Sequence, residues 1–229
     1  MTHDRRRSDL PSPVPVVPGS VGILGGTFDP IHLAHLAVAE EVRELLGLER
    51  IRFVPAGRPV HRPLPPVASA EDRLAMVEAA IAGNPAFESS RAEVDRPGPS
   101  YAVDTIEEFV SEARAAGREP DFTFILSAEA YAGLPTWREP ARILELCRIA
   151  VVPRPDARPS DPSAVAALIP GADRRTILLD GPSLAVSGSM IRARLAAGRS
   201  IRYLVPAAVA AYIDDHSLYA DNPRRNPTP

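Results

Sequence analysis

The sequence has little cysteine and little net charge. Its one cysteine, Cys147, stands alone among 229 residues, which excludes an internal disulfide framework. A single cysteine is typical of proteins in a reducing compartment, and we therefore expect a cytoplasmic protein. The 26 lysine and arginine residues nearly balance the 29 aspartate and glutamate residues, for a net charge of −3. This balance favours neither a nucleic acid nor a membrane surface as a partner.

Long apolar runs are also missing. No stretch approaches the ~20 apolar residues that a membrane-spanning helix needs. The basic cluster at residues 5–7 is followed by a proline-rich segment, whereas a signal peptide needs a continuous apolar stretch. We therefore predict a disordered extension at residues 1–19 and a disordered tail at 220–229. Residues 20–219 are then predicted to form a single domain with a sizeable core.

Strand-like apolar runs alternate along the chain with segments of helical periodicity. This alternation predicts βαβ units and a Rossmann-like α/β fold, which is a doubly wound, mostly parallel sheet with helices on both faces and a helical C-terminal end. Ligands bind such sheets at the carboxyl ends of the strands, where the strand order reverses. The predicted strands cover residues 21–24, 51–55, 87–94, 121–126, 149–153 and 176–179. The predicted helices cover residues 33–46, 70–82, 102–115, 142–146, 162–168, 188–197 and 207–216.

The most informative segment is the run GGTFDPIHLAH at residues 25–35, which follows the first predicted strand and opens the first predicted helix. Gly25 and Gly26 let the backbone turn sharply and leave room for a ligand to approach the main chain. The first turn of the helix points free N–H groups and a positive dipole end toward that turn. This arrangement suits a phosphate group.

Two histidines, His32 and His35, stand three residues apart at the start of this helix. At that spacing their side chains fall on one face and can reach one anion together. The pair could also form part of a zinc site, but zinc needs a third or fourth Cys, His, Asp or Glu ligand. The chain has five histidines and one cysteine, with no second pair at metal-binding spacing. We therefore favour phosphate and assign no metal-binding residue.

A second phosphate-binding segment is predicted at residues 185–194, AVSGSMIRAR. Small residues open a helix there, so the hydroxyls of Ser187 and Ser189 and the nearby N–H groups can hold a phosphate. Arg192, one turn into the helix, can add a planar bidentate fork. Taken alone, the segment is better explained by an ordinary serine cap followed by a surface arginine.

Together the two segments resemble the two signatures of the nucleotidylyltransferase superfamily. The first resembles its His-x-Gly-His signature, with Ala34 where the family usually has glycine. The longer run around it resembles the form found in bacterial nicotinate-nucleotide adenylyltransferases. The second segment resembles the signature Ile-Ser-Ser-Thr-x-Ile-Arg, with departures at Val186, Gly188 and Ser189. The resemblance covers about residues 20–219, and two signatures in order make it specific.

This resemblance implies transfer of AMP from ATP to nicotinate mononucleotide, giving deamido-NAD and pyrophosphate in NAD biosynthesis. It implies that His32, His35 and Arg192 are the catalytic residues, with His35 near the α-phosphate and Arg192 at the β and γ oxygens. Magnesium is expected to arrive with ATP. ATP and nicotinate mononucleotide are the expected partners, and a homo-oligomer is compatible with the sequence. The residues implied to bind ATP are Gly25, Gly26, Thr27, Phe28, His32, His35, Ser187, Ser189 and Arg192.

Further segments resemble those that bind the second substrate in this family. Residues 54–63 resemble a Pro-x-His-Lys loop with Arg62 in place of lysine, and the helix start at 100–105 would hold the nicotinate carboxylate on free N–H groups. The one tryptophan, Trp137, would stack on the pyridine ring. Without the resemblance, a surface turn, a core tyrosine and a core tryptophan explain these segments as well. The residues implied to bind nicotinate mononucleotide are Asp29, Arg62, Ser100, Tyr101, Ala102, Glu129, Trp137 and Arg138.

Three departures from the family pattern leave other functions open. Ala34 narrows the space over the helix start, and Ser127 and Glu129 replace the family's glycine and aspartate after a strand. One alternative is an adenylyltransferase that acts on nicotinamide mononucleotide or phosphopantetheine. Another is a regulator that binds ATP but releases no pyrophosphate.

Overall fold

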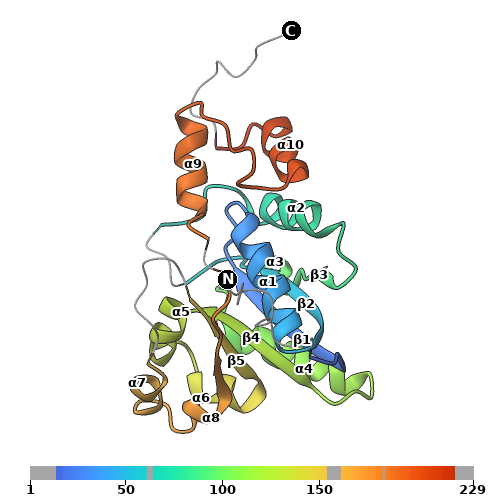
Figure 1. Ribbon diagram of the computed structural model, residues 1–229, viewed down its shortest axis with the longest axis vertical. Coiled ribbons are helices and arrows are strands. Elements are labelled where there is room, and N and C mark those ends of the chain that lie inside the picture. Colours follow the sequence, from blue (N-terminus) through green and yellow to red (C-terminus); the bar gives the residue numbers. More distant parts are fainter. Residues whose placement is uncertain (1–13, 61–63, 154–160, 183, 220–229) are drawn as a thin grey trace, which may run out of the picture.

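Parallel strands form the centre of the molecule (Figure 1). The computed structural model describes residues 14–60, 64–153, 161–182 and 184–219. Its strands are β1 (Val17–Gly26), β2 (Leu48–Pro55), β3 (Phe87–Ser89), β4 (Asp121–Ser127), β5 (Arg148–Val152) and β6 (Thr176–Leu178). They form one sheet in the order β3-β2-β1-β4-β5-β6, and each neighbouring pair is parallel. The order reverses between β1 and β4, so the carboxyl ends of these two strands mark the expected ligand site.

Helices cover both faces of the sheet, as predicted. One face carries α1 (Leu33–Leu45), α2 (Ala70–Ile81), α9 (Gly188–Ala196) and α10 (Ala207–Asp215). The other face carries α4 (Ala102–Ala115), α5 (Ala128–Gly133), α6 (Pro140–Leu146), α7 (Pro162–Ala166) and α8 (Ala172–Arg175). The predicted helical C-terminal end consists of α9 and α10, and α10 packs against α2.

The alternation of side chains along the strands divides the core into two layers. In β4, Phe124 and Leu126 join the cluster that includes α4, whereas Ile125 between them joins the cluster that includes α1. In β2, Ile51 and Phe53 likewise belong to the α1 side. Because helices bury both faces, apolar residues of the central strands contribute to both layers of the core.

The first strand begins earlier than predicted. β1 starts at Val17, three residues before the predicted domain start, and the N–H of Val17 donates to the carbonyl oxygen of Gly47 at 2.8 Å. Proline-rich composition led to a prediction of disorder here, but main-chain pairing needs no particular side chain. The rest of the predicted extension, up to residue 13, and the predicted tail lie outside the described residues.

The third strand is shorter than predicted, because the chain turns after Ser89. The hydroxyl of Ser90 accepts from the N–H of Ala92 at 3.3 Å, a local bond that favours a turn, and the short helix α3 (Ala92–Asp95) follows. β3 lies at the edge of the sheet and pairs only with β2 in the described residues, so fewer main-chain bonds keep it extended.

Two short helices are also absent from the sequence prediction. α5 has six residues and α8 has four, which are too few for a periodic signal.

We expect Cys147 to be unreactive in the native protein. Its side chain is buried, at 2% exposure, and its thiol donates to the carbonyl oxygen of Ile143 at 3.3 Å. Burial raises the pKa of the thiol to about 12, and the thiolate is the reactive form. At about pH 8 a chromogenic disulfide reagent should therefore react only after denaturant is added. Rapid colour development with the native protein would contradict this.

Candidate active site

The strand β1 carries the glycine turn to the carboxyl edge of the sheet. Gly26 ends the strand, and its carbonyl oxygen accepts from the N–H of Ala56 at 2.9 Å. Phe28 follows with a positive φ of 50°, and its side chain is 2% exposed. Its ring packs against Phe53 and meets the ring of His35 edge-on, with centroids 5.0 Å apart. The buried Phe28 therefore holds the turn against the start of α1.

His32 and His35 lie side by side at the start of α1, as their spacing predicts. Their rings are stacked with centroids 3.7 Å apart and planes inclined by 18°. The Nδ1 atom of His35 accepts a hydrogen bond from the N–H of His32 at 3.3 Å. In a neutral ring this leaves the proton of His35 on Nε2, where it can be donated to an anion. Three N–H groups of the first turn already have acceptors: that of Leu33 donates to the carbonyl oxygen of Leu204 at 3.0 Å, and those of His35 and Leu36 donate to the carbonyl oxygen of His32 at 3.0 and 3.5 Å. The expected row of free N–H groups is therefore wrong, and the Nε2 proton of His35 is the donor that the pair can offer to an anion.

The carboxylate of Asp29 is buried behind the turn, where the residue is 5% exposed. It accepts hydrogen bonds from the N–H groups of Val67 at 2.9 Å and Ala68 at 3.1 Å. The hydroxyl of Tyr219 donates to the same carboxylate at 2.7 Å. Burial and this bond raise the pKa of Tyr219 well above its ordinary value, so the hydroxyl remains a donor. These contacts favour a positioning role for Asp29 over the predicted contact with the acceptor.

The second predicted segment meets the first at Asp29. The hydroxyl of Ser187 caps α9 by accepting from the N–H of Met190 at 3.2 Å, and it lies 3.1 Å from the hydroxyl of Ser189. One turn later, Arg192 donates through Nη1 to the carbonyl oxygen of Asp29, 163 residues away along the chain. The same Nη1 lies 3.5 Å from the Asp29 carboxylate. The structure therefore brings together the two segments that are predicted to bind phosphate.

Gly188 allows this close contact. A Cβ atom at this position would lie 2.7 Å from the carbonyl oxygen of Asp29 and 3.3 Å from Nη1 of Arg192. The serine of the family signature would require one of these groups to move, whereas glycine has no Cβ to accommodate. This departure from the signature thus fits the packing of this chain.

Arg73 is a part of the site that the sequence analysis missed. The residue is 1% exposed, and its guanidinium donates to the carbonyl oxygens of Thr27 at 2.7 Å and Gly57 at 3.3 Å. Its signal in the sequence is an arginine on the apolar face of α2, next to Leu74. Tyr219 was also missed as a polar contact, because its partner Asp29 is 190 residues away and leaves no local signal.

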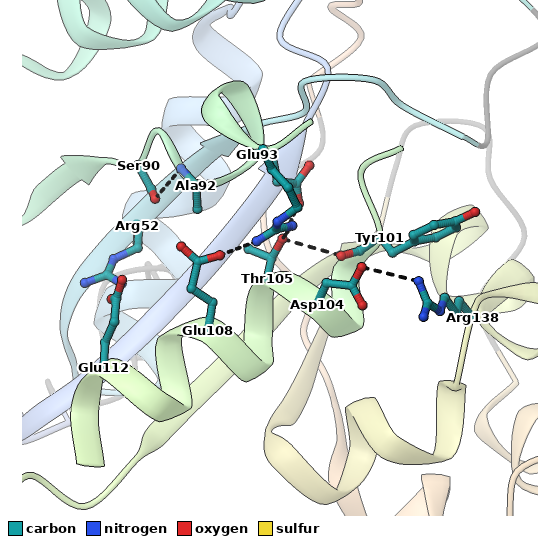
Figure 2. Close-up of polar contacts among 11 residues, drawn as sticks. Arg52, Ser90, Ala92, Glu93, Tyr101, Asp104, Thr105, Glu108, Glu112 and Arg138 are labelled. Carbon is teal, nitrogen blue, oxygen red and sulfur yellow. Dashed lines mark hydrogen bonds and ion pairs between the residues drawn. The ribbon is translucent and has the colours of Figure 1, made fainter. Parts of the chain in front are cut away.

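Several residues predicted to bind the acceptor gather at the start of α4. Ser100 precedes the helix, Tyr101 is its N-cap residue and Ala102 is its first residue. The guanidinium of Arg138 lies 4.9 Å from the centre of the Tyr101 ring and 3.4 Å from the carboxylate of Asp104 (Figure 2). The structure thus brings two separate acceptor segments together.

Two further predicted acceptor residues follow β4. Trp137 is half-buried, and its ring meets that of Phe124 edge-on with centroids 6.1 Å apart. Glu129 is exposed in the first turn of α5. The hydroxyl of Ser127 caps this helix by accepting from the N–H of Ala130 at 3.2 Å, so this serine, where the family usually has glycine, has a structural use.

The remaining predicted site residues lie near the reversal of strand order or outside the described part. Gly25 is exposed near the end of β1, and Thr27 is buried just beyond it. Arg62 lies outside the described residues.

In the part of the chain that the structure describes, no three His, Cys, Asp or Glu side chains are grouped to hold a metal ion. No helix in that part is long and apolar enough to cross a membrane.

A family model matches most of the chain and defines its class. Residues 23–194 match the model described as cytidylyltransferase-like. This range includes the glycine turn, the histidine pair and the start of α9. The chain belongs to the cytidylyltransferase-like family and is a nucleotidyltransferase.

Curated relatives narrow the class to a particular enzyme. A protein of Roseiflexus sp. (strain RS-1) named "Probable nicotinate-nucleotide adenylyltransferase" is 49% identical over 199 residues, which cover 87% of this chain and 97% of the relative. A protein of Pseudomonas fluorescens with the same name is 43% identical over 210 residues, covering 87% and 96%. Within its family, this chain belongs with the nicotinate-nucleotide adenylyltransferases.

Solved structures with the same architecture confirm the predicted fold. The nicotinic acid mononucleotide adenylyltransferase of Plasmodium falciparum, complexed with NaAD, has a TM-score of 0.69 at 18% identity and covers 87% of this chain and 97% of its own. The same enzyme complexed with APC has a TM-score of 0.67, with 87% and 96% covered. The Rossmann-like α/β architecture is shared at this low identity.

We expect the hydroxyl of Tyr219 to contribute more to stability than that of Tyr212. Tyr219→Phe removes a donor from the buried Asp29 carboxylate, which should lower the free energy of unfolding by about 1–3 kcal/mol. Tyr212 donates to the Asp72 carboxylate at 3.0 Å, but this carboxylate is partly exposed, so Tyr212→Phe should cost about 1 kcal/mol or less. Urea unfolding of both variants measures the difference, and equal losses would contradict it.

Proposed function

We propose that this protein transfers AMP from ATP to nicotinate mononucleotide, forming deamido-NAD and pyrophosphate in NAD biosynthesis. One observation carries the proposal: the stacked pair His32 and His35 and the guanidinium of Arg192 adjoin the same buried turn. Relatives that are 43–49% identical and are named for this activity support it. We place the reaction in the cytoplasm, in keeping with the single buried cysteine.

The triphosphate of ATP lies over the start of α1 in this proposal. The Nε2 proton of His35 and the positive end of the α1 dipole face the α-phosphate, and Arg192 binds the β and γ oxygens. The start of α9, with the hydroxyls of Ser187 and Ser189, lies next to Arg192 and faces the same phosphates. The backbone near Gly26 leaves room for the nucleotide to approach the turn.

The reaction is a displacement at the α-phosphorus. A phosphate oxygen of nicotinate mononucleotide, already ionised at neutral pH, forms a bond to the α-phosphorus. The bond from that phosphorus to the oxygen bridging to the β-phosphate breaks, and pyrophosphate leaves with the electron pair. The nucleophile carries no proton, so the protein needs no general base. Its residues align the two substrates and stabilise the charge that develops on the phosphate oxygens.

The start of α4 binds the nicotinate ring in this proposal. Free N–H groups at Tyr101 and Ala102 face the carboxylate, and Trp137 offers an aromatic face to the pyridine ring. Arg138 adds positive charge beside them, held by Asp104 and the Tyr101 ring. Charge and N–H donors together favour nicotinate over the neutral nicotinamide. Arg62 and Glu129 complete the proposed contacts with the mononucleotide.

Magnesium is proposed to enter with ATP rather than to reside in the protein. Mg²⁺ usually keeps several waters and binds substrate phosphates together with one or two carboxylates. Among the described residues no group of three metal-binding side chains is present, and the Asp29 carboxylate already accepts three hydrogen bonds. When bound to ATP, the ion neutralises charge on the leaving pyrophosphate.

The decisive assay is pyrophosphate release from ATP with three acceptors compared side by side. We expect release with nicotinate mononucleotide to exceed release with nicotinamide mononucleotide and with phosphopantetheine. Preference for either of the other two acceptors would mean that the start of α4 has been misinterpreted. ATP binding without release from any acceptor would instead support a non-catalytic nucleotide-binding regulator.

Replacing either histidine of the pair should slow the reaction far more than it destabilises the fold. We expect His32→Ala and His35→Ala each to lower kcat on the order of 100-fold, as loss of a donor to a charged transition state does. His216→Ala is a matched control, because His216 also stacks on an aromatic ring, that of Tyr212, with centroids 3.9 Å apart, but lies exposed at the end of α10. Steady-state kinetics and thermal melting test this, and near-normal turnover in both pair variants would refute the phosphate-binding role.

A further inference from the structure

A buried carboxylate lies behind the proposed acceptor site. Glu93 belongs to α3, between β3 and α4, and is 8% exposed. Burial raises the pKa of its carboxyl group, and hydrogen bonds with Thr105 and Ser100 oppose this rise. Figure 2 shows Glu93 and Thr105 together at the start of α4. A buried carboxylate is costly without hydrogen-bond donors. Glu93 therefore fixes the positions of the side chains that donate to it.

The first of these donors lies in the first turns of α4. The Thr105 hydroxyl donates to Oε1 of Glu93 at 2.8 Å and accepts from Nη1 of Arg96 at 2.8 Å. A guanidinium can only donate, so the proton of the hydroxyl points away from Arg96. Its nearer acceptor is Glu93, since the carbonyl oxygen of Tyr101 lies 3.4 Å away. This chain of bonds ties α4 to α3 close to the free N–H groups that the acceptor would use.

The second partner connects Glu93 to the loop after β2. The Ser100 hydroxyl lowers the pKa of the Glu93 carboxyl group. The same hydroxyl accepts from the N–H of Arg58 at 3.0 Å, and the N–H of Ser100 donates to the carbonyl oxygen of Arg58 at 2.9 Å. The loop also packs on α3 directly, because a Cβ at Gly57 would lie 2.0 Å from the carbonyl oxygen of Glu93. Glu93 thus touches both segments predicted to enclose the acceptor.

We propose that Glu93 is a positioning residue for the acceptor. Its carboxylate accepts from Thr105 and its main chain packs on Gly57, so that the N–H groups at the start of α4 and residues 57–60 keep the geometry in which they receive nicotinate mononucleotide. This inference rests on the proposed function. The proposed ATP site, at the start of α1 and α9, lies on the other face of the sheet, so the effect of Glu93 falls mainly on the acceptor.

The test separates affinity for the two substrates. Glu93→Gln keeps the shape of the side chain but places an N–H₂ group where one of its hydroxyl partners needs an acceptor. Thr105→Val removes the hydroxyl that donates to Glu93, with little change in side-chain volume. Thr105→Ser keeps this hydroxyl. Glu108→Gln is the matched control, because Glu108 pairs with Arg96 on the exposed side of the same network.

We expect Glu93→Gln and Thr105→Val to raise KM for nicotinate mononucleotide about tenfold while KM for ATP stays within about twofold of wild type. Thr105→Ser and Glu108→Gln should resemble wild type. An unchanged KM for nicotinate mononucleotide in Glu93→Gln and Thr105→Val, or an equal rise in both KM values together with a lower melting temperature, would overturn the inference. If Glu93→Gln does not fold, Thr105→Val alone decides.

Wild-type turnover is measured first, so that the two proposals fail separately. Absence of wild-type turnover with nicotinate mononucleotide overturns the proposed function. Normal wild-type turnover with unaffected Glu93→Gln and Thr105→Val variants overturns only the role of Glu93.

Discussion

A carboxylate removed from water needs donors from the protein, and Asp29 obtains them from parts of the chain that are far apart in the sequence. Its partners are main-chain N–H groups before α2 and the hydroxyl of Tyr219 beyond α10, while Arg192 of α9 donates to its main-chain carbonyl. Leaving such a group unpaired would cost several kcal/mol. The Asp29 carboxylate therefore determines where three separate segments can lie around the glycine turn.

A second buried charge joins the two halves of the site. Arg73 donates to the carbonyl oxygen of Thr27, in the segment proposed to bind ATP, and to that of Gly57, in the loop proposed to bind the acceptor. The guanidinium is planar and its donors point in fixed directions, so the two carbonyl oxygens have a defined separation. A reaction that depends on placing one phosphate against another needs such a constraint more than it needs a reactive side chain.

The sequence predicts the parts of this molecule whose signals are local. Spacing places His32 and His35 together, apolar alternation yields the parallel sheet with helices on both faces, and small residues before Arg192 open α9 as expected. The early start of β1 and the short helices α3, α5 and α8 escape prediction, because main-chain pairing and single capping bonds leave no periodic pattern. The contact of Asp29 with Tyr219 spans 190 residues, and only folding reveals it.

Two of the departures from the family signatures are explained by packing. Gly188 makes room for the contact between Asp29 and Arg192, and Ser127 supplies the cap of α5. Each substitution satisfies its own surroundings. Gly188 does remove the hydroxyl of the signature serine, so main-chain N–H groups would have to make that phosphate contact. When the nucleophile is already ionised, activity depends on where groups are held, so a chain that changes signature residues but keeps their geometry keeps the means of catalysis. This favours an enzyme over a regulator that has lost turnover.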